Sequence, residues 1–117
     1  MNNEETVRAY LGAMFGGRSD FDRARALLAD DLEYEGPMLT AVDADDFIGQ
    51  MRGIAAQVPA MKAEIRHVIA QGDLVAALYQ LGQPHPVLFA EWFTVRDGRI
   101  TAISIVHDTR PYAGVAG

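Results

Sequence analysis

Glu91 is the residue whose type and position in this sequence most need a chemical explanation. The segment PVLFAEWFTVRDGRI, residues 86–100, has the alternating pattern of a β-strand that runs into a turn. On the face that carries Glu91, the other side chains are apolar, namely Phe89, Phe93 and Val95. A carboxyl group among apolar neighbours loses solvation when it ionises, so its pKa should rise, and the neutral acid can donate a strong hydrogen bond to an oxyanion. The alternatives are a Glu91 satisfied by an arginine or a backbone amide at a cavity rim, or one that faces solvent.

Three tyrosines and one histidine could share this chemistry. Tyr10 lies on the apolar stripe of a predicted helix, and the alternation of their strands points Tyr34 and Tyr79 inward. Core packing explains each tyrosine taken alone, but three phenols around one carboxyl group exceed what packing needs. His107 ends the inner face of the last strand, where it is a candidate general base. Its alternative role is that of a rim histidine hydrogen-bonded to the backbone.

Metal and cofactor chemistry find little support in the sequence. The three histidines, His67, His85 and His107, lie on different predicted elements, and the chain has no cysteine. It also lacks a Ser-His-Asp signature, a glycine-rich phosphate loop and a dinucleotide fingerprint. We therefore expect no metal and no cofactor.

The composition predicts one acidic globular domain over residues 1–117. The net charge is −6, from 10 Lys and Arg against 16 Asp and Glu, and no basic stripe is present. This balance argues against nucleic acids and anionic membranes as partners. No apolar run is long enough to span a bilayer, and the start MNNEETVRAY is unlike a targeting peptide, so a cytoplasmic location is expected.

The periodicity predicts three helices followed by strands. The helices cover residues 2–17, 19–31 and 43–57, with Pro59 closing the third, and a short strand over 32–36 precedes that third helix. Four further strands form two hairpins, with turns at the Gly72-Asp73 and Asp97-Gly98 dipeptides; they cover residues 61–71, 74–82, 87–95 and 99–108. Helices first and an antiparallel meander afterwards indicate an α+β fold with the helices packed on one face of the sheet.

The register of the last hairpin decides which residue faces Glu91. A two-residue turn at Asp97-Gly98 would place Glu91 opposite Ser104, whereas a three-residue loop would place it opposite Ile103. We prefer the second register because the bulky apolar residues of both strands then coincide. The inner face would hold Phe89, Glu91, Phe93, Ile103, Ile105 and His107. In that register Glu91 and His107 are more than about 10 Å apart, too far for a catalytic dyad.

The other face of this hairpin is also apolar, with Leu88, Trp92 and Val106. The outer face of an antiparallel sheet is usually polar, so we expect a second copy of the chain to cover it in a homodimer. The alternative is cover by the third helix or by the C-terminal tail.

Four segments carry a family resemblance: VRAYLGAMFGG, ALLADDLEYEGP, VIAQGDLVAALY and AEWFTVRDGRITAISIVHDTRPY. With the order of the elements, they make residues 4–112 resemble the nuclear-transport-factor-2-like superfamily, in its ketosteroid isomerase and SnoaL-like polyketide cyclase branch. The resemblance implies a cone: a strongly curved sheet around the three helices, with an internal cavity.

The resemblance also implies roles for single residues. Tyr10 and Glu91 fall on the two positions that bind the substrate's oxyanion in ketosteroid isomerases, while Gly36 replaces the aspartate that moves the proton. For an apolar ligand, the cavity wall is expected to include Tyr34, Tyr79, Phe89, Phe93, Ile103, Ile105, Met14, Phe47 and Met51.

Two functions follow from these expectations. The first is a cofactor-independent isomerase, cyclase or dehydratase acting on an apolar, carbonyl-bearing small molecule, with Tyr10 and Glu91 holding the oxyanion and His107 or a water moving the proton. The second is a non-catalytic binding or assembly module that has lost its base at Gly36. The fold alone does not choose between them.

Overall fold

The computed structural model describes residues 1–58, 61–82 and 85–114, and its first element, α1 (Asn3–Phe15), is one of the predicted helices. Asn2 caps it in a capping box, in which the Asn2 side chain accepts from the Glu5 amide and the Glu5 side chain accepts from the Asn2 amide. The helix ends at Gly16. The third predicted helix is also present, as α3 (Ala44–Gln57), capped by the Asp43 side chain. Pro59, predicted to close it, lies outside the described residues.

The second predicted helix is much shorter than expected. α2 (Phe21–Ala26) has six residues, and the chain enters β1 (Leu28–Glu35) directly after it, where the sequence predicted helix up to residue 31. Leu28 pairs with Ile100, and the Ile100 amide donates to the Leu27 carbonyl at 2.8 Å. Hydrogen bonding to a distant strand thus overrides a local helical pattern at this point.

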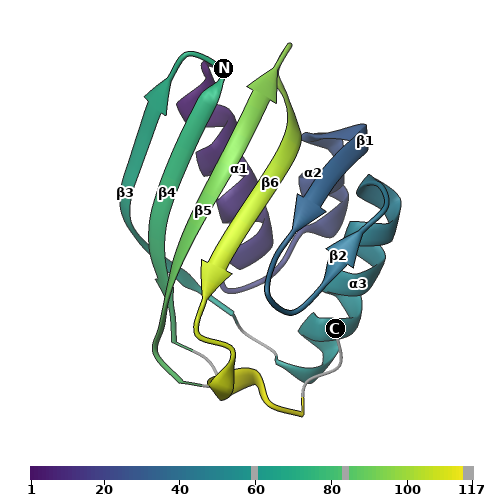
Figure 1. The fold of residues 1–117 in the computed structure, drawn as a ribbon, viewed down its shortest axis with the longest axis vertical. Helices are drawn as coiled ribbons and strands as arrows, with labels where there is room; N and C mark the ends of the chain where they lie inside the picture. Colours follow the sequence, from purple (N-terminus) through teal and green to yellow (C-terminus); the bar gives the residue numbers. More distant parts are fainter. Residues whose placement is uncertain (59–60, 83–84, 115–117) are drawn as a thin grey trace.

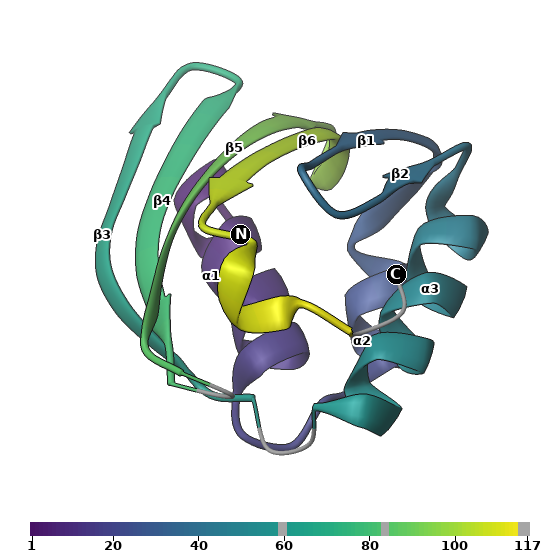
Figure 2. The same ribbon diagram turned by 60° about the horizontal axis from the view of Figure 1, so that its bottom comes forward.

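In the described part of the chain, six strands form one mixed sheet in the order β2-β1-β6-β5-β4-β3. Besides β1, they are β2 (Thr40–Ala41), β3 (Ala63–Gln71), β4 (Leu74–Leu81), β5 (Val87–Arg96) and β6 (Arg99–His107). β1 runs parallel to β6, whereas the other neighbours are antiparallel. Figure 1 shows the meander of β3 to β6, and the turned view of Figure 2 shows the sheet curving around α1 without closing, with α3 on the side of β1 and β2. The predicted α+β fold is confirmed.

Both predicted registers of the last hairpin are wrong. Asp97 and Gly98 form a two-residue turn with φ of 52° and 75°, but a β-bulge follows, in which Thr101 is an extra residue between Ile100 and Ala102. Glu91 consequently pairs with Ile105. The assignment of side chains to faces is confirmed, because the burial of β5 alternates strictly along the strand.

The bulge brings His107 closer to Glu91 than either predicted register allowed. His107 pairs with Phe89, so it stands diagonally across the hairpin from Glu91 on the same face. Diagonal neighbours of this kind lie about 7–8 Å apart, within reach of long or aromatic side chains. The prediction of a separation above about 10 Å is therefore wrong.

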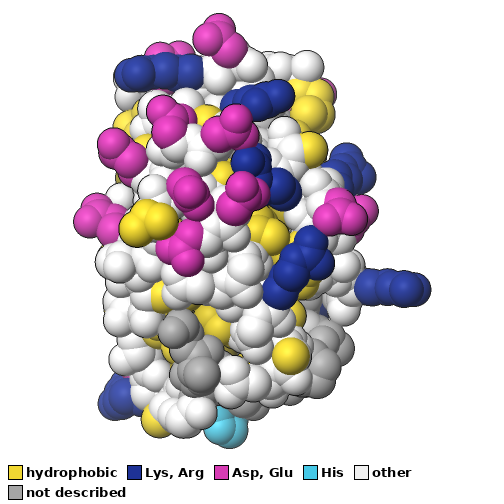
Figure 3. Space-filling view, turned by 90° about the vertical axis from the view of Figure 1, so that its right-hand side faces the viewer, with side chains coloured by type: hydrophobic (Ala, Val, Ile, Leu, Met, Phe, Trp, Pro, Cys, Tyr) yellow, Lys and Arg dark blue, Asp and Glu magenta, His cyan; other side chains and the backbone are white. Residues whose placement is uncertain are grey.

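Ion pairs tie α2 and α3 to their surroundings on one side of the molecule. Arg25 bonds both Asp45 and Asp30, each at 2.7 Å, and Arg52 bonds Asp22 at 2.9 Å. Figure 3 shows acidic and basic side chains interleaved over the side on which α3 lies. None of the helices in the described part of the chain combines the length and hydrophobicity needed to cross a membrane.

Candidate functional site

A cavity of about 60 Å³ lies between α1, α3, β1, the sheet and the short 3-10 helix η1 (Arg110–Tyr112). Its wall is mostly apolar and includes Met38, Met51 and Met61. This volume holds a few water molecules, whereas pockets for drug-sized ligands measure about 300–1,000 Å³. A larger ligand requires side chains to move, and methionine, with its flexible thioether, is suited to that.

Glu91 comes from β5 and is buried at the cavity wall, with 2% of its surface exposed. The Tyr79 hydroxyl donates a 2.6 Å hydrogen bond to its Oε1 atom. Burial raises the pKa of Glu91 from 4.5 to about 7, although the hydrogen bond from Tyr79 lowers it in part. The carboxyl group therefore exists in both protonation states near neutral pH, as a general acid or base requires.

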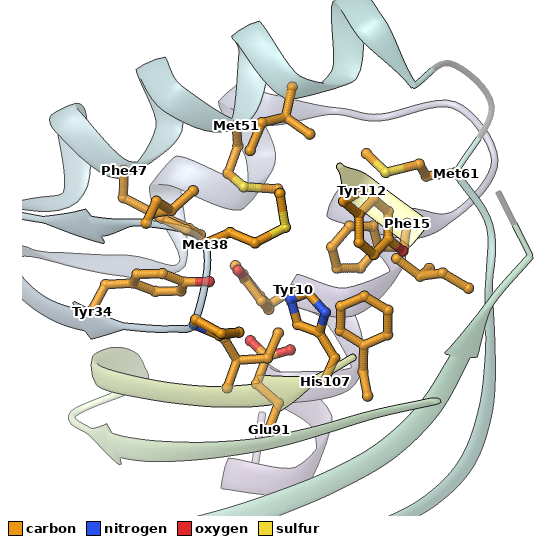
Figure 4. A pocket seen from close by; sticks show the side chains of 16 residues that line it. Tyr10, Phe15, Tyr34, Met38, Phe47, Met51, Met61, Glu91, His107 and Tyr112 are labelled. Carbon is orange, nitrogen blue, oxygen red and sulfur yellow. The ribbon is translucent and has the colours of Figure 1, made fainter. Parts of the chain in front are cut away.

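Tyr10 and Tyr34 reach the same cavity from α1 and β1. Figure 4 shows their side chains converging with those of Glu91 and His107. Burial, and after it the nearby Glu91 carboxylate, raises the pKa of both phenols above their ordinary value, so both stay protonated as donors. No hydrogen bond joins either hydroxyl to another described residue. They can therefore donate to a ligand.

His107 lies half-buried on β6 and lines the cavity. Its Nδ1 atom is 2.8 Å from the Asp108 carbonyl oxygen, and because a carbonyl only accepts, Nδ1 carries the hydrogen. In the neutral ring, Nε2 is then the atom with the free lone pair. The ring stacks on Phe89 with centroids 4.3 Å apart, and Tyr112 packs edge-on against it at 5.5 Å.

The position of Gly36 has no room for a side chain. A Cβ atom there would lie 2.6 Å from Ile105 Cγ2 and 3.3 Å from the Tyr34 hydroxyl. Glu35, next to it, faces the outer side, where it accepts a hydrogen bond from Ser104 at 3.0 Å. The space that a side chain at position 36 would take is therefore filled by Ile105 and Tyr34.

The residues predicted for the pocket divide into two groups. Tyr34, Phe47, Met51, Phe89 and Ile105 line the cavity together with Tyr10, Glu91 and His107. The other four are fully buried in the core and do not line it: Met14, Tyr79, Phe93 and Ile103.

Sequence reasoning missed several wall residues. Phe15 follows Met14 on the predicted apolar stripe of the first helix, so the pattern could have identified it. Met38, Leu39 and Tyr112 lie outside the predicted elements, and Met61, the first residue of a predicted strand, precedes β3 in the structure. Across the described residues, no group of three or more metal-binding side chains could hold a metal ion.

Solved structures share this fold over nearly the whole chain. An LEH-like epoxide hydrolase of M. tuberculosis is 27% identical, covering 97% of this chain and 88% of its own, with a TM-score of 0.75. IdmH of Streptomyces antibioticus, provisionally named a polyketide cyclase, is 22% identical over 95% of both chains, with a TM-score of 0.80. A Kribbella flavida protein provisionally named a ketosteroid isomerase is 18% identical, covering 91% of this chain and 77% of its own, with a TM-score of 0.78.

Sequence comparison identifies the family. No curated protein matches the chain. The family model of the SnoaL-like domain, however, matches residues 7–103, which include Tyr10, Tyr34 and Glu91. The chain therefore belongs to the SnoaL-like domain family of the nuclear-transport-factor-2-like superfamily.

Proposed function

We propose that this protein is a cofactor-independent enzyme that binds an apolar, carbonyl-bearing small molecule in the cavity and moves a proton next to the carbonyl group. Isomerisation, cyclisation and dehydration share this chemistry. The observation that carries the proposal is the buried Glu91 carboxyl group beside two phenols that bond no described residue. An acid or base and an oxyanion site are the two parts that such a reaction needs.

The roles follow from the contacts of each group. Ionised Glu91 takes a proton from the carbon next to the carbonyl. The electrons of that C–H bond form a C=C bond to the carbonyl carbon, and the π electrons of the C=O bond move onto the oxygen. Tyr10 and Tyr34 donate hydrogen bonds to the resulting oxyanion. Protonated Glu91 then returns the proton to carbon. Glu91 thus supplies the proton transfer for which Gly36 has no side chain, and His107, through the lone pair on Nε2, is a second proton acceptor at the cavity wall.

The pH dependence of proton exchange tests this function. We expect the protein to exchange the α-protons of ethyl acetoacetate or 2-cyclohexenone with solvent deuterium above the buffer rate, measured by proton NMR. The catalysed rate should rise with pH through a midpoint at about 7 and then level off, because only ionised Glu91 accepts a proton. Binding of these probes without catalysed exchange at any pH would instead support the non-catalytic binding module.

The similarity to an epoxide hydrolase gives a second candidate function. Opening an epoxide needs a donor to the ring oxygen and a base for the attacking water, and Tyr10 or Tyr34 and Glu91 have these chemical types. Gas chromatography can measure diol formation from 1-methylcyclohexene oxide. A rate of diol formation above the rate of proton exchange would favour this candidate.

We also propose a homodimer through the outer face of the sheet. Leu88, Trp92 and Val106 expose 47%, 45% and 58% of their surfaces there, and Ile69 and Leu74 on the neighbouring strands are exposed as well. A second copy offers the same apolar face, which is what a two-fold interface requires.

Trp92→Glu should therefore convert the dimer to a monomer, because it places a charge at the centre of this face. Sedimentation equilibrium measures the change, with the unmodified chain expected at twice the mass of one copy. Ala56→Glu is the matched control, since Ala56 is exposed on α3, which is not part of the sheet, and this variant should keep the dimer. An unmodified chain that sediments as a monomer would contradict the proposal.

A further inference from the structure

We infer that Tyr79 is a positioning residue for Glu91: its buried hydroxyl holds one carboxyl oxygen and leaves the other for the ligand. Its catalytic consequence rests on the proposed function above. Its effect on the carboxyl group itself does not, so the two can be tested apart.

The contact joins neighbouring strands inside the core. Tyr79 on β4 pairs with Phe89, and Glu91 pairs with Ala77, so the two side chains are diagonal neighbours on one face. The Tyr79 hydroxyl lies 2.6 Å from Glu91 Oε1, and both residues are buried, with 0% and 2% of their surfaces exposed. This separation is typical of a hydroxyl that donates to a charged carboxylate. Tyr79 does not line the cavity, so it acts through Glu91.

Aromatic packing fixes the ring that carries this hydroxyl. The Tyr79 ring stacks on Phe89 with centroids 5.3 Å apart and an angle of 8° between planes. The Phe15 ring also stacks on the Tyr79 ring, with centroids 5.7 Å apart and an angle of 30° between the planes. The donor is therefore held in place before any ligand arrives, and a preorganised donor costs no rearrangement when charge develops.

Two consequences follow for Glu91. Because Oε1 already accepts from Tyr79, Oε2 is the oxygen left to exchange a proton with a ligand in the cavity. A donor to the carboxylate also favours the ionised form and so opposes the effect of burial on the pKa. The surrounding elements bring Tyr10 from α1, Tyr34 from β1 and His107 from β6 to the same cavity. Among the described residues, Tyr79 is the hydrogen-bond donor to Glu91.

Tyr79→Phe tests the inference, since it removes the hydroxyl and keeps the stacked ring. We expect the titration midpoint of Glu91 to rise by about one to two pH units, the effect of losing a hydrogen bond to a charged group. Carboxyl carbon NMR of the ligand-free protein with labelled glutamate measures this, with Glu91→Gln assigning the resonance. In the exchange assay, the midpoint of the pH profile should move by the same amount.

Tyr34→Phe is the matched control in the same cavity. It removes a hydroxyl that makes no hydrogen bond to Glu91, so it should lower the plateau of the exchange rate and leave the Glu91 midpoint in place. A purely structural Tyr79 would leave that midpoint unchanged in Tyr79→Phe, and this result would overturn the inference. A shifted midpoint in a protein that catalyses no exchange would support the positioning role and overturn the proposed function.

Discussion

Glu91→Gln should lower the catalysed rate of α-proton exchange by about two to four orders of magnitude, the usual contribution of a general acid or base. Glutamine has nearly the shape of glutamate and can still accept a hydrogen bond from Tyr79, but it cannot take up a proton at neutral pH. The NMR exchange assay with ethyl acetoacetate measures the loss. Retention of the full rate would show that another group moves the proton.

The same substitution should also change how stability depends on pH. Glu91 titrates at about 7 in the folded protein, against an ordinary value of 4.5 for the unfolded chain. Between these pH values the folded state binds more protons, so the free energy of unfolding falls as pH rises from about 4.5 to about 7. This difference in pKa corresponds to about 3 kcal/mol of lost stability. The glutamine side chain of Glu91→Gln does not titrate, so the variant should lack this loss.

Urea unfolding of both proteins at pH 5 and pH 8 tests this effect, because the contributions of other titrating groups cancel in the comparison. Glu35→Gln is the matched control: it removes an exposed carboxyl group from the outer face of β1. The Glu35→Gln variant should keep the native exchange rate and the native pH dependence of the free energy of unfolding. Equal pH dependence in the native protein and Glu91→Gln would mean that Glu91 does not titrate at a raised pKa.

Gly36→Ala should destabilise the protein by about 1–3 kcal/mol, the usual cost of overpacking a core. The added methyl group would meet Ile105 Cγ2 at 2.6 Å, an atom fixed close to the β6 backbone. In an Ile105→Ala background that atom is gone. The φ angle of Gly36 is not positive, so alanine fits the backbone there, and with the Tyr34 hydroxyl still 3.3 Å away the substitution should destabilise this background less than the native protein.

Chemical unfolding of the four proteins in a double-mutant cycle measures this coupling. Gly53→Ala in α3 is the control for the glycine effect, since nothing lies within 4 Å of its added methyl group. It should stabilise by about 1 kcal/mol, as expected inside a helix. If Gly36→Ala lowers the free energy of unfolding equally in the native protein and in the Ile105→Ala background, the Ile105 side chain is not what excludes a methyl group at position 36.

Much of the fold was predictable because its signals are local. Alternation along β5 assigned Glu91 to the buried face, and the cap at Asn2 and the turn at Asp97-Gly98 follow from residue preferences. The spacing of apolar residues in the sequence also indicates the bulge at Thr101. Ile100 and Ile103 are both buried although they are three residues apart, a spacing that uninterrupted alternation does not allow.

The rest depends on contacts between distant segments. Leu28 joins a strand and not a helix because it pairs with Ile100, 72 positions later. The hydrogen bond from Tyr79 to Glu91 needs the register of β4 against β5, and the wall residues Met38 and Tyr112 come to one cavity from segments that lie far apart in the sequence. Local periodicity carries no information on these pairings.

The place of β6 in the sheet has a consequence for biosynthesis. β6 is translated after the other five strands of this sheet, yet it lies between β1 and β5 and is the strand through which β1 and β2 join the meander. While the ribosome still holds residues 99–107, β1 lacks its parallel neighbour and the cavity lacks Ile105 and His107. In a nascent chain this sheet and the wall of this cavity therefore stay incomplete until residues 99–112 have emerged, and such long-range closure slows folding.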